Sequence, residues 1–399
     1  MKIRKAFKYR LKPAQAQAEM LSQFTGHCRF VWNKVLSLNL ARLKEKQPLI
    51  WYHEADYWSK LWKRSDEFGF LKEAPAHCIQ QKLKDLDKAF KDAFDKNQPN
   101  KRIPRFRKRG QHDSIRFPEP KHIKVEGRRV CLPKVGWIRF YKSQGIVGTI
   151  KNATVSKHAG YWYVSIQTEV DIDSPKHPSS TDIGIDMGIS KLFALSNGQV
   201  RLPLSSFKKH KGKLAKLQKQ FSRKKKFSEG WKKQKGKLQR LHSKIANCRR
   251  DYLHKSTTEI SKNHAMIVIE DLKVSNMSKS AKGDTEKPGK NVKAKSGLNR
   301  SILDQGWAEA RRQLEYKQAW RGGIVFVVPA QYTSQKCSRC GHVDKASRPS
   351  QETYCCTSCG MEMNADINAA KNILAAGHAV LAGGAEPLGA AMKPEPLAA

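Results

Sequence analysis

Apolar and polar residues alternate at the start of the chain and then recur at helical spacing. Residues 3–11 alternate basic and apolar side chains, which predicts a strand with one basic, solvated face. From Pro13 to about residue 96 apolar positions recur every three or four residues, which predicts a helical region. We expect its last helix to begin near Pro75, because proline is tolerated in the first helical turn.

Short alternating segments fill residues 114–169. They are separated by turn residues, and several such strands in a row predict a small sandwich or barrel. A basic loop at 101–110 precedes them. The stretch 171–180, with two prolines and three serines, is expected to be a linker to the second half of the chain.

The second half alternates predicted strands and helices. Residues 182–204 predict a three-strand meander, because Asn197-Gly198 suits a tight turn. Residues 208–250 predict a helical hairpin with narrow apolar stripes and two cationic faces. The other expected elements are, in order, a strand at 265–270, a loop at 273–299, a helix near 300–320, a strand at 323–328, a helix at 364–376 and a disordered tail at 377–399.

The charge of the chain indicates a polyanionic partner. Lys and Arg number 77 and Asp and Glu 35, which gives a formal net charge of +42. Nucleic acid is favoured over an anionic membrane, because we find no bilayer-spanning stretch, signal peptide or lipidation motif. Residues 208–250 hold 18 Lys or Arg and one acid, so phosphate contact is favoured there over a solvated charged face.

Four of the nine cysteines form two CxxC pairs. Fifteen residues separate the pairs, a spacing typical of zinc ribbons, and four thiolates close a tetrahedral shell. We therefore predict a structural Zn²⁺ site, favoured over disulfides, made by Cys337, Cys340, Cys356 and Cys359. The neighbouring Cys355 and His342 are expected to lie outside the shell.

Three carboxylates could hold magnesium. Asp186 lies in the first strand of the predicted meander, Glu270 ends the strand at 265–270, and Asp366 opens the last predicted helix. In a ribonuclease-H-like fold the first and fourth strands are adjacent and parallel, which would bring the first two acids together. Two Mg²⁺ ions held by shared carboxylates can hydrolyse phosphodiesters. Any one acid alone could equally be a strand-end or helix-cap residue.

The residues around Asp186 support this hypothesis. Gly184 and Gly188 share its face of the strand and are expected to leave room for a phosphate and metals. Asn368 could contribute a neutral oxygen to the site or a hydrogen bond to the strand being cut. Asp182 and Asp271 rank lower, because the first begins its strand and the second should face away from Glu270.

With these motifs the chain resembles the TnpB family of transposon-associated RNA-guided DNA endonucleases, which are related to type V CRISPR effectors. The matching stretches are DIGIDMGI at 182–189, IVIEDL at 267–272, LNRSI at 298–302, QKCSRCG at 335–341 and ADINAAKNI at 365–373. The N-terminal half matches more weakly at 9–13, 30–33, 104–106 and 114–117. The resemblance covers residues 1–376.

The resemblance implies an α/β multidomain protein with a RuvC (ribonuclease-H-like) nuclease domain that carries an inserted four-cysteine zinc ribbon. A wedge-like β-barrel with a helical recognition insertion precedes it. The implied boundaries are 1–12 plus 104–170 for the barrel, 13–103 for the helical domain, 171–336 plus 361–376 for the nuclease domain with its basic hairpin at 205–250, 337–360 for the ribbon and 377–399 for the tail.

The resemblance also implies an activity. Such a protein binds a guide RNA from the transposon end, recognises a short target-adjacent motif and cuts double-stranded DNA in one RuvC site. Asp186, Glu270 and Asp366 match the catalytic acids, which hold two Mg²⁺ ions, and the four cysteines match the ligands of one Zn²⁺. A prokaryotic, cytoplasmic protein acting at the nucleoid is expected, with no membrane partner.

Some polar side chains are candidate nucleic-acid contacts. Glutamine pairs well with adenine in the major groove, and Arg and Lys bind phosphate. The candidates are Gln80, Gln81, Lys84, Arg105, Lys108, Arg109 and Arg348. For each of them an ordinary exposed residue is the favoured alternative.

Two other functions compete with the guided endonuclease. The first is a guide-independent transposase or DNA nuclease, against which we find no separate helix-turn-helix in the sequence. The second is a non-catalytic nucleic-acid-binding regulator, against which all three acids are present.

Overall fold

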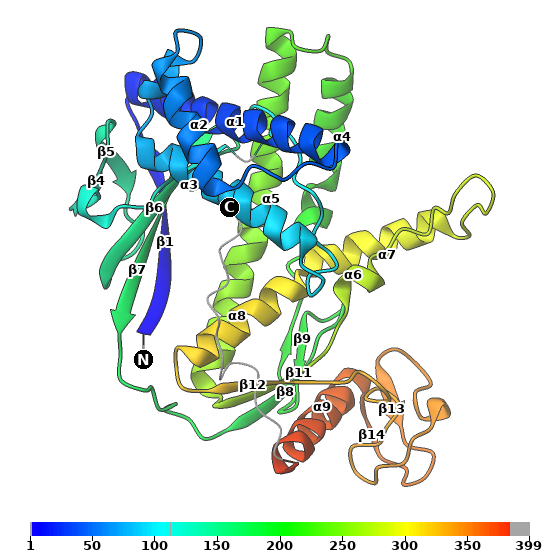
Figure 1. The fold of residues 1–399 in the computed structure, drawn as a ribbon. Helices are drawn as coiled ribbons and strands as arrows, with labels where there is room; N and C mark the ends of the chain where they lie inside the picture. The colour runs from blue at the N-terminus through cyan, green and yellow to red at the C-terminus, as the bar shows by residue number, and fades with distance from the viewer. Residues whose placement is uncertain (1, 112, 384–399) are drawn as a thin grey trace. The chain divides into compact units, whose positions relative to one another are not determined.

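The computed structural model describes residues 2–111 and 113–383. The chain divides into two compact units, the first from Met1 to Ile172 and the second beginning at Asp173 (Figure 1). The division falls within the predicted linker at 171–180, where the structure has no regular element after residue 171.

A seven-stranded antiparallel sheet forms the base of the first unit. Its strand order is β2-β6-β7-β1-β5-β4-β3. The strands are β1 (Lys2–Lys12), β2 (Ser114–Phe117), β3 (Lys124–Glu126), β4 (Arg129–Leu132), β5 (Gly136–Tyr141), β6 (Thr149–His158) and β7 (Tyr161–Asp171). Among the described residues the edge strands β2 and β3 do not pair with each other. The predicted small barrel is therefore a half-barrel sheet.

Helices inserted between β1 and β2 pack on this sheet. They are α1 (Gln15–Lys44), α2 (Tyr52–Arg64) and α3 (Ala76–Phe94), and Pro75 is the N-cap of α3. Short 3-10 turns lie at Gly69–Lys72 and Pro120–His122. Leu21 and Val31 of α1 share one buried core with Ile79 of α3 and with Ile115 and Val164 of the sheet. The prediction of a helical region over 13–96 is confirmed.

The second unit contains a five-stranded sheet of order β10-β9-β8-β11-β12. The strands are β8 (Asp182–Asp186), β9 (Phe193–Leu195), β10 (Val200–Arg201), β11 (Met266–Glu270) and β12 (Ile324–Val328). β8, β9 and β10 form the predicted antiparallel meander, with Gly198 at φ 91° in its turn. β11 lies between β8 and β12 and is parallel to both, as the sequence predicted for the first and fourth strands.

Helices cover both faces of this sheet. The predicted basic hairpin consists of α4 (Ser206–Ser222) and α5 (Glu229–Asn263). The C-terminal half of α5 packs with α8 (Trp307–Ala319) on one face of the sheet. On the opposite face lies α9 (Ala365–Ala382) (Figure 1). Its Ile373 packs against Val268 and Phe326. Ile183 and Ile185 point toward α5 and α8, so the intervening Gly184 faces α9.

For two stretches of the second unit, the predicted elements differ from the observed ones. The expected loop at 273–299 contains α6 (Val274–Met277) and the first half of α7 (Val292–Gln305). Polar side chains rather than apolar ones hold α7 there, since Lys295 donates to the Met277 carbonyl at 2.7 Å and Asn299 to that of Ser278 at 3.0 Å. The single helix expected near 300–320 is two helices, α7 and α8, separated by Gly306 at φ 75°.

The last helix also exceeds its prediction. The sequence placed residues 377–399 in a disordered tail, but α9 continues to Ala382 because Gly377 packs directly on Val268 of β11. Residues 384–399 of that predicted tail lie outside the described residues. In the described part of the chain, no helix combines the length and apolar character needed to cross a membrane.

Gly184 lets α9 approach the sheet. A methyl group at Gly184 would overlap the Ala370 carbonyl oxygen and lie 2.8 Å from the Leu374 backbone nitrogen. The sequence hypothesis that this glycine leaves room for a phosphate was therefore wrong: the space is filled by helix backbone. Gly188 likewise leaves room for the chain, since a methyl group there would lie 2.9 Å from the Lys191 carbonyl oxygen.

We expect Gly184→Ala to lower the free energy of unfolding by about 2–3 kcal/mol, because a backbone carbonyl cannot rotate away as a side chain can. Urea unfolding measures this change. The matched control is Gly212→Ala in α4, where an added methyl meets nothing within 4 Å and alanine favours the helix. Equal stability of the Gly184→Ala protein and the parent would contradict this packing argument.

Candidate functional site

The three predicted acids come from three elements that meet at one edge of the second sheet. Asp186 ends β8 and Glu270 ends β11, and in this parallel pair Ile185 lies opposite Ile269. The two carboxylates therefore leave the sheet side by side. Asp366 lies in the first turn of α9, which crosses the same face and packs on β8.

Burial and mutual repulsion disfavour the charged form of Asp186. Burial is the largest cause that raises its pKa, to about 7, and the charges of Glu270 and Asp366 add to it. Glu270 is 8% exposed, and burial raises its pKa too, although the Thr333 hydroxyl donates to its Oε1 at 2.6 Å and favours the charged form. Asp186 thus lies within reach of the charges of the other two acids.

Two cations face Asp366. Lys191 Nζ lies 3.0 Å from its Oδ2, and Arg348 Nη2 lies 3.6 Å from its Oδ1. These cations partly offset the repulsion at Asp186. The sequence singled out Arg348 as a nucleic-acid contact but missed Lys191, whose only signal was a basic residue five positions after Asp186.

The chemistry of these side chains fits a divalent cation. Carboxylate oxygens are the hard ligands that Mg²⁺ prefers, and two cations leave the negative charge of three carboxylates incompletely neutralised. The ligand oxygens of the three acids do not all lie within 4.8 Å of one another. Within the described ranges, the four cysteines alone form a group of His, Cys, Asp or Glu side chains whose ligand atoms all lie within 4.8 Å.

The lower-ranked acids have partners elsewhere. Asp182 Oδ2 lies 3.0 Å from His378 Nε2, and Asp271 Oδ1 lies 2.8 Å from Arg311 Nη1. Both side chains are therefore engaged outside the group formed by the three predicted acids.

Asn368 does not face the carboxylates. Its Nδ2 donates to the Lys336 carbonyl at 2.8 Å, and its Oδ1 accepts from the Ser338 backbone N–H at 3.0 Å. The expectation that it contributes an oxygen to the site was wrong, because this fully buried amide fastens the first cysteine loop to α9. Asn372, one turn later, donates to the carbonyls of Lys336 and Thr333 at 2.6 and 2.9 Å. Sequence reasoning missed it, although two amides four residues apart on an alanine-rich helix were a usable signal.

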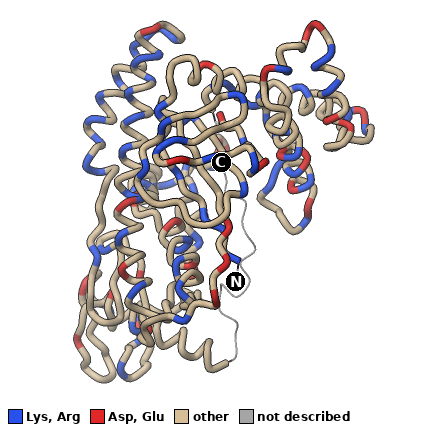
Figure 2. Tube along the Cα trace, turned by 90° about the vertical axis from the view of Figure 1, so that its left-hand side faces the viewer, with Lys and Arg blue, Asp and Glu red and all other residues tan. Residues whose placement is uncertain are grey.

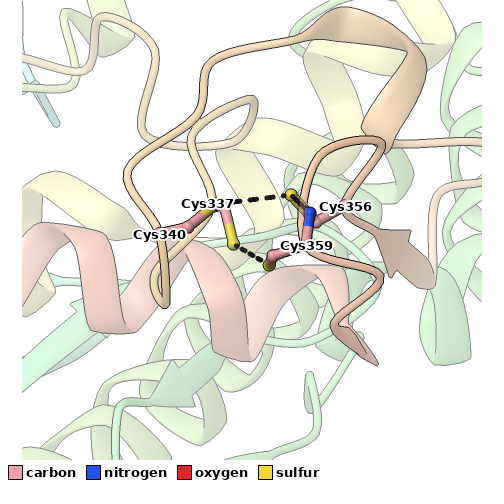
Figure 3. Close-up of side chains that lie close together, drawn as sticks. All are labelled: Cys337, Cys340, Cys356 and Cys359. Atoms are coloured by element: carbon pink, nitrogen blue, oxygen red, sulfur yellow. Dashed lines mark hydrogen bonds between the residues drawn. The ribbon is translucent and has the colours of Figure 1, made fainter.

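The four predicted zinc ligands converge. The Sγ atoms of Cys337 and Cys359 are 3.7 Å apart, those of Cys340 and Cys356 are 3.6 Å apart, and all four lie within 4.8 Å of one another (Figure 3). A tetrahedral ion with Zn–S bonds near 2.3 Å needs sulfur atoms roughly 3.8 Å apart. Cys355 and His342 do not belong to the group. The arrangement is compatible with the predicted zinc site.

Backbone amides prepare the thiols for a cation. Gly341 and Gly360 adopt φ values of 78° and 68°, and their N–H groups donate to the carbonyls of Cys337 and Cys356, each at 3.0 Å. Burial and the neighbouring thiols raise the pKa of Cys359. In contrast, the Cys359 backbone N–H donates to Cys356 Sγ at 3.4 Å and is the largest cause that lowers the pKa of Cys356, to about 6. Zinc binds thiolates, so this shift favours the ligand form.

The cysteine module is small and tied to the carboxylates. It contains β13 (Thr353–Cys355), β14 (Glu362–Asn364) and a 3-10 turn at Lys345–Ser347. Asn364 caps α9 by accepting from the Asp366 backbone N–H at 3.2 Å. The segment that enters the module contributes Thr333 to Glu270, so both ends of the module lead into the acid site.

The predicted nucleic-acid contacts lie in places of different character. Gln80 and Gln81 of α3 are half-buried and donate to Asp56 at 3.5 Å and Asp85 at 3.0 Å, while Lys84 is exposed beside the Tyr52 ring. Their proposed role in reading bases stays a prediction.

The basic loop before β2 is anchored to α1. Trp32 donates to the Arg105 carbonyl at 3.2 Å, and the Arg107 guanidinium stacks on the Trp32 ring at 3.8 Å. Arg107 is partly buried, and burial lowers its pKa. Because its side chain packs on Trp32, we assign it to holding the loop on α1. Arg105, Lys108 and Arg109 are exposed and stay candidate contacts.

The raised pKa of Asp186 predicts how stability depends on pH without magnesium. Between about pH 4 and pH 7 the folded protein binds more protons at this group than the unfolded chain, so the free energy of unfolding falls as pH rises and levels off above pH 7. We expect Asp186→Asn to remove this decline and to stabilise the metal-free site by about 1–3 kcal/mol at pH 8. Urea unfolding at pH 4.5, 6 and 8 measures it.

Asp251→Asn is the matched control for this experiment, because Asp251 is 64% exposed on α5 and pairs with Lys255. Its stability should follow the parent curve. A parent protein whose stability rises between pH 5 and pH 7 relative to Asp186→Asn would contradict the shift.

Three family models match the chain. One described as "Probable transposase" matches residues 165–281, one described as "Cas12f1-like, TNB domain" matches 307–373, and one described as "Helix-turn-helix domain" matches 1–48. Over that last range the structure has β1 and the single helix α1, and α2 begins only at Tyr52. The description of the matched model therefore favours the guide-independent alternative, whereas the single helix described in this range does not form a helix-turn-helix.

Relatives span nearly the whole chain. A protein of Escherichia coli K12 named "Putative RNA-guided DNA endonuclease InsQ" is 53% identical over 384 residues, covering 96% of this chain and 95% of the relative. A "Putative RNA-guided DNA endonuclease" of Streptomyces pristinaespiralis is 32% identical over 390 residues, covering 96% and 91%.

A solved structure shares the fold. The chain superposes with a TM-score of 0.53 and 13% identity on a protein from the "Cryo-EM structure of the Cas12f1-sgRNA-target DNA complex", covering 93% of this chain and 98% of that one. At this identity the likeness concerns the fold alone. Together with the matched models and relatives, it confirms the resemblance read from the sequence: the chain belongs to the TnpB family, whose transposase model it matches and whose fold is related to that of Cas12f1.

Proposed function

We propose that this protein is an RNA-guided endonuclease that cuts double-stranded DNA beside a short target-adjacent motif, using a guide RNA from the end of its transposon. Relatives that match it over nearly their whole length carry the name RNA-guided DNA endonuclease. The observation that carries the proposal is that Asp186, Glu270 and Asp366 come together from β8, β11 and α9, where Asp186 is buried and within reach of the charges of the other two.

These three residues would hold two Mg²⁺ ions, which when bound activate a water and stabilise the leaving oxygen of a phosphodiester. Asp186 releases its proton to become a ligand, and the Thr333 hydroxyl keeps Glu270 oriented. The N-cap Asn364 fixes the direction of Asp366. Arg348, beside Asp366, is suitably placed to contact a phosphate of the scissile strand.

The four-cysteine module is proposed to hold one structural Zn²⁺, because a closed thiolate shell leaves no open position for a substrate. In this proposal residues 337–360 are the zinc ribbon and 171–336 plus 361–376 the nuclease domain. Residues 1–12 plus 104–170 form the wedge and 13–103 the recognition domain.

The charge supports binding of a guide and target. In guided nucleases the protein binds the backbone while base pairing reads the sequence, so a large basic surface is needed. Lys and Arg are spread over the chain and outnumber the acids (Figure 2). The hairpin α4–α5 has a thin apolar contact made by Leu214, Leu241 and Ile245, and residues 208–250 hold 18 Lys or Arg and one acid. We assign it to the RNA or heteroduplex backbone.

The decisive experiment purifies the protein from cells that carry its native flanking DNA and sequences the RNA that accompanies it. One discrete RNA from the element's end, whose removal abolishes Mg²⁺-dependent cutting, is the expected result. Random cellular RNA, together with cutting that persists after ribonuclease treatment, would contradict the guided mechanism.

That second result would favour a guide-independent transposase, the alternative supported by the helix-turn-helix and transposase models that match residues 1–48 and 165–281. A discrete RNA with no cutting by the intact protein would instead favour a regulator without catalysis.

A further inference from the structure

Lys191 is held rigidly in the turn that follows β8. The next residue, Leu192, is buried, and its N–H donates to the Arg201 carbonyl of β10 at 2.8 Å. On the other side, Gly188 passes so close to the Lys191 carbonyl that no side chain fits there. The backbone of Lys191 is therefore fixed by the sheet, and its side chain has a defined direction.

The ammonium group of Lys191 joins two parts of the acid site. It lies 3.0 Å from Asp366 Oδ2 and donates to Asn364 Oδ1 at 2.9 Å. Asn364 Oδ1 also accepts from the N–H groups of Asp366 and Ile367, at 3.2 and 3.4 Å. One cation thus contacts both the carboxylate and the residue that caps its helix.

This ion pair is more shielded from water than the ordinary pairs of the same unit. The side chains of Lys191 and Asp366 are 18% and 15% exposed, whereas those of Lys255 and Asp251 on α5 are 75% and 64% exposed. Coulomb interactions strengthen as water is excluded, so the lysine charge is felt strongly at Asp366.

We propose that Lys191 is a positioning residue that occupies Asp366 in the metal-free protein and competes with the divalent cation for that carboxylate. The proposal rests on the function proposed above, in which Asp366 is a metal ligand. The positive charge keeps the carboxylate oriented before metal arrives, and it opposes a second positive charge at the same oxygen atoms.

When Lys191 is replaced, the loss of its positive charge should change metal affinity more than the loss of its contacts with Asp366 and Asn364. Without the ammonium group, α9 keeps its cap at Asn364, and Asn368 and Asn372 still bind the loop before Ser338. The helix start therefore remains in place in a Lys191 variant, and the main change at Asp366 is the loss of a positive charge. A lysine that merely supported the fold would weaken metal binding when removed; Lys191 should do the opposite.

The test titrates Mg²⁺ into the full-length protein, freed of nucleic acid and retaining its zinc, by isothermal calorimetry. Bound Mn²⁺ is counted in parallel by electron paramagnetic resonance. We expect Lys191→Met to lower the Kd for Mg²⁺ about three- to tenfold. Lys191→Gln should do the same, because its amide can still donate to Asn364 without the charge. Lys191→Arg, which keeps the charge, should bind as the parent does.

Lys255→Met is the matched control, since it removes one lysine and one Lys–Asp pair from a solvent-exposed site of the same unit. Asp366→Ala gives the signal from ions bound elsewhere. Clear binding by the parent with unchanged or weaker binding by folded Lys191→Met and Lys191→Gln overturns this proposal alone. Equal signals from the parent and Asp366→Ala overturn the metal site of the proposed function, and this proposal with it.

Discussion

A protein carrying Asp186→Ala should lose DNA cleavage at least about a thousandfold while keeping its affinity for RNA and DNA. Burial first and the charges of the other two acids second disfavour the charged form of Asp186, so its carboxylate has most to gain from a cation and is central to holding one. Removing it relieves repulsion in the metal-free protein and leaves the packing of Ile183 and Ile185 unchanged. The loss should therefore appear in catalysis and not in folding.

Single-turnover cleavage of a target duplex by the RNA-loaded protein, with binding measured on the same preparations, tests this expectation. Asp271→Ala is the matched control: it removes a carboxylate next to Glu270, one that pairs with Arg311 of α8 instead of facing the site. An Asp186→Ala protein that still cuts in clean preparations, or one that fails to bind nucleic acid, would contradict the assignment.

Loss of one cysteine thiolate should disable both the zinc module and the acid site. We expect Cys337→Ser to lose its zinc, to melt at a lower temperature and to cut at least about a hundredfold more slowly. Cys337 is buried within the four-cysteine group and lies between the backbone groups that Asn368 binds, the Lys336 carbonyl and the Ser338 N–H. When this loop unfolds, the start of α9 loses its anchor.

Atomic emission gives the zinc content, and calorimetric melting gives the stability. Cys355→Ser is the control, because Cys355 adjoins Cys356 in sequence but lies outside the group of four. It should keep one zinc per chain and full activity. If Cys337→Ser retained its zinc or its rate of cutting, the module would be neither a zinc site nor a support for the carboxylates.

The parts of the site that could be predicted from sequence are those governed by periodicity and spacing. Strand alternation placed Asp186 on the face opposite Ile183 and Ile185, and the order of elements placed β8 beside β11. The spacing of the two CxxC pairs predicted which cysteines would converge. Each of these signals is local or follows from a known strand order.

What the sequence did not reveal depends on contacts between distant segments. Gly184 looked like space for a ligand, but only the path of α9 shows that Ala370 fills it. Asn368 looked like a ligand because it follows Asp366, whereas its amide binds a loop thirty residues earlier. The first half of helix α7 was missed because hydrogen bonds from its side chains to the Met277 and Ser278 carbonyls hold it there, and an apolar stripe does not.

Because Asp366 lies on α9, after the zinc ribbon in the chain, the acid site becomes complete only when this helix has been made. A growing chain that ends before Asn364 already carries the basic hairpin and the first two acids, but it lacks the third. Domains fold from the N-terminus as they emerge from the ribosome. On the proposed function, a nascent protein can therefore take up RNA before it is able to cut, and a chain released early would be inert rather than an unguided nuclease.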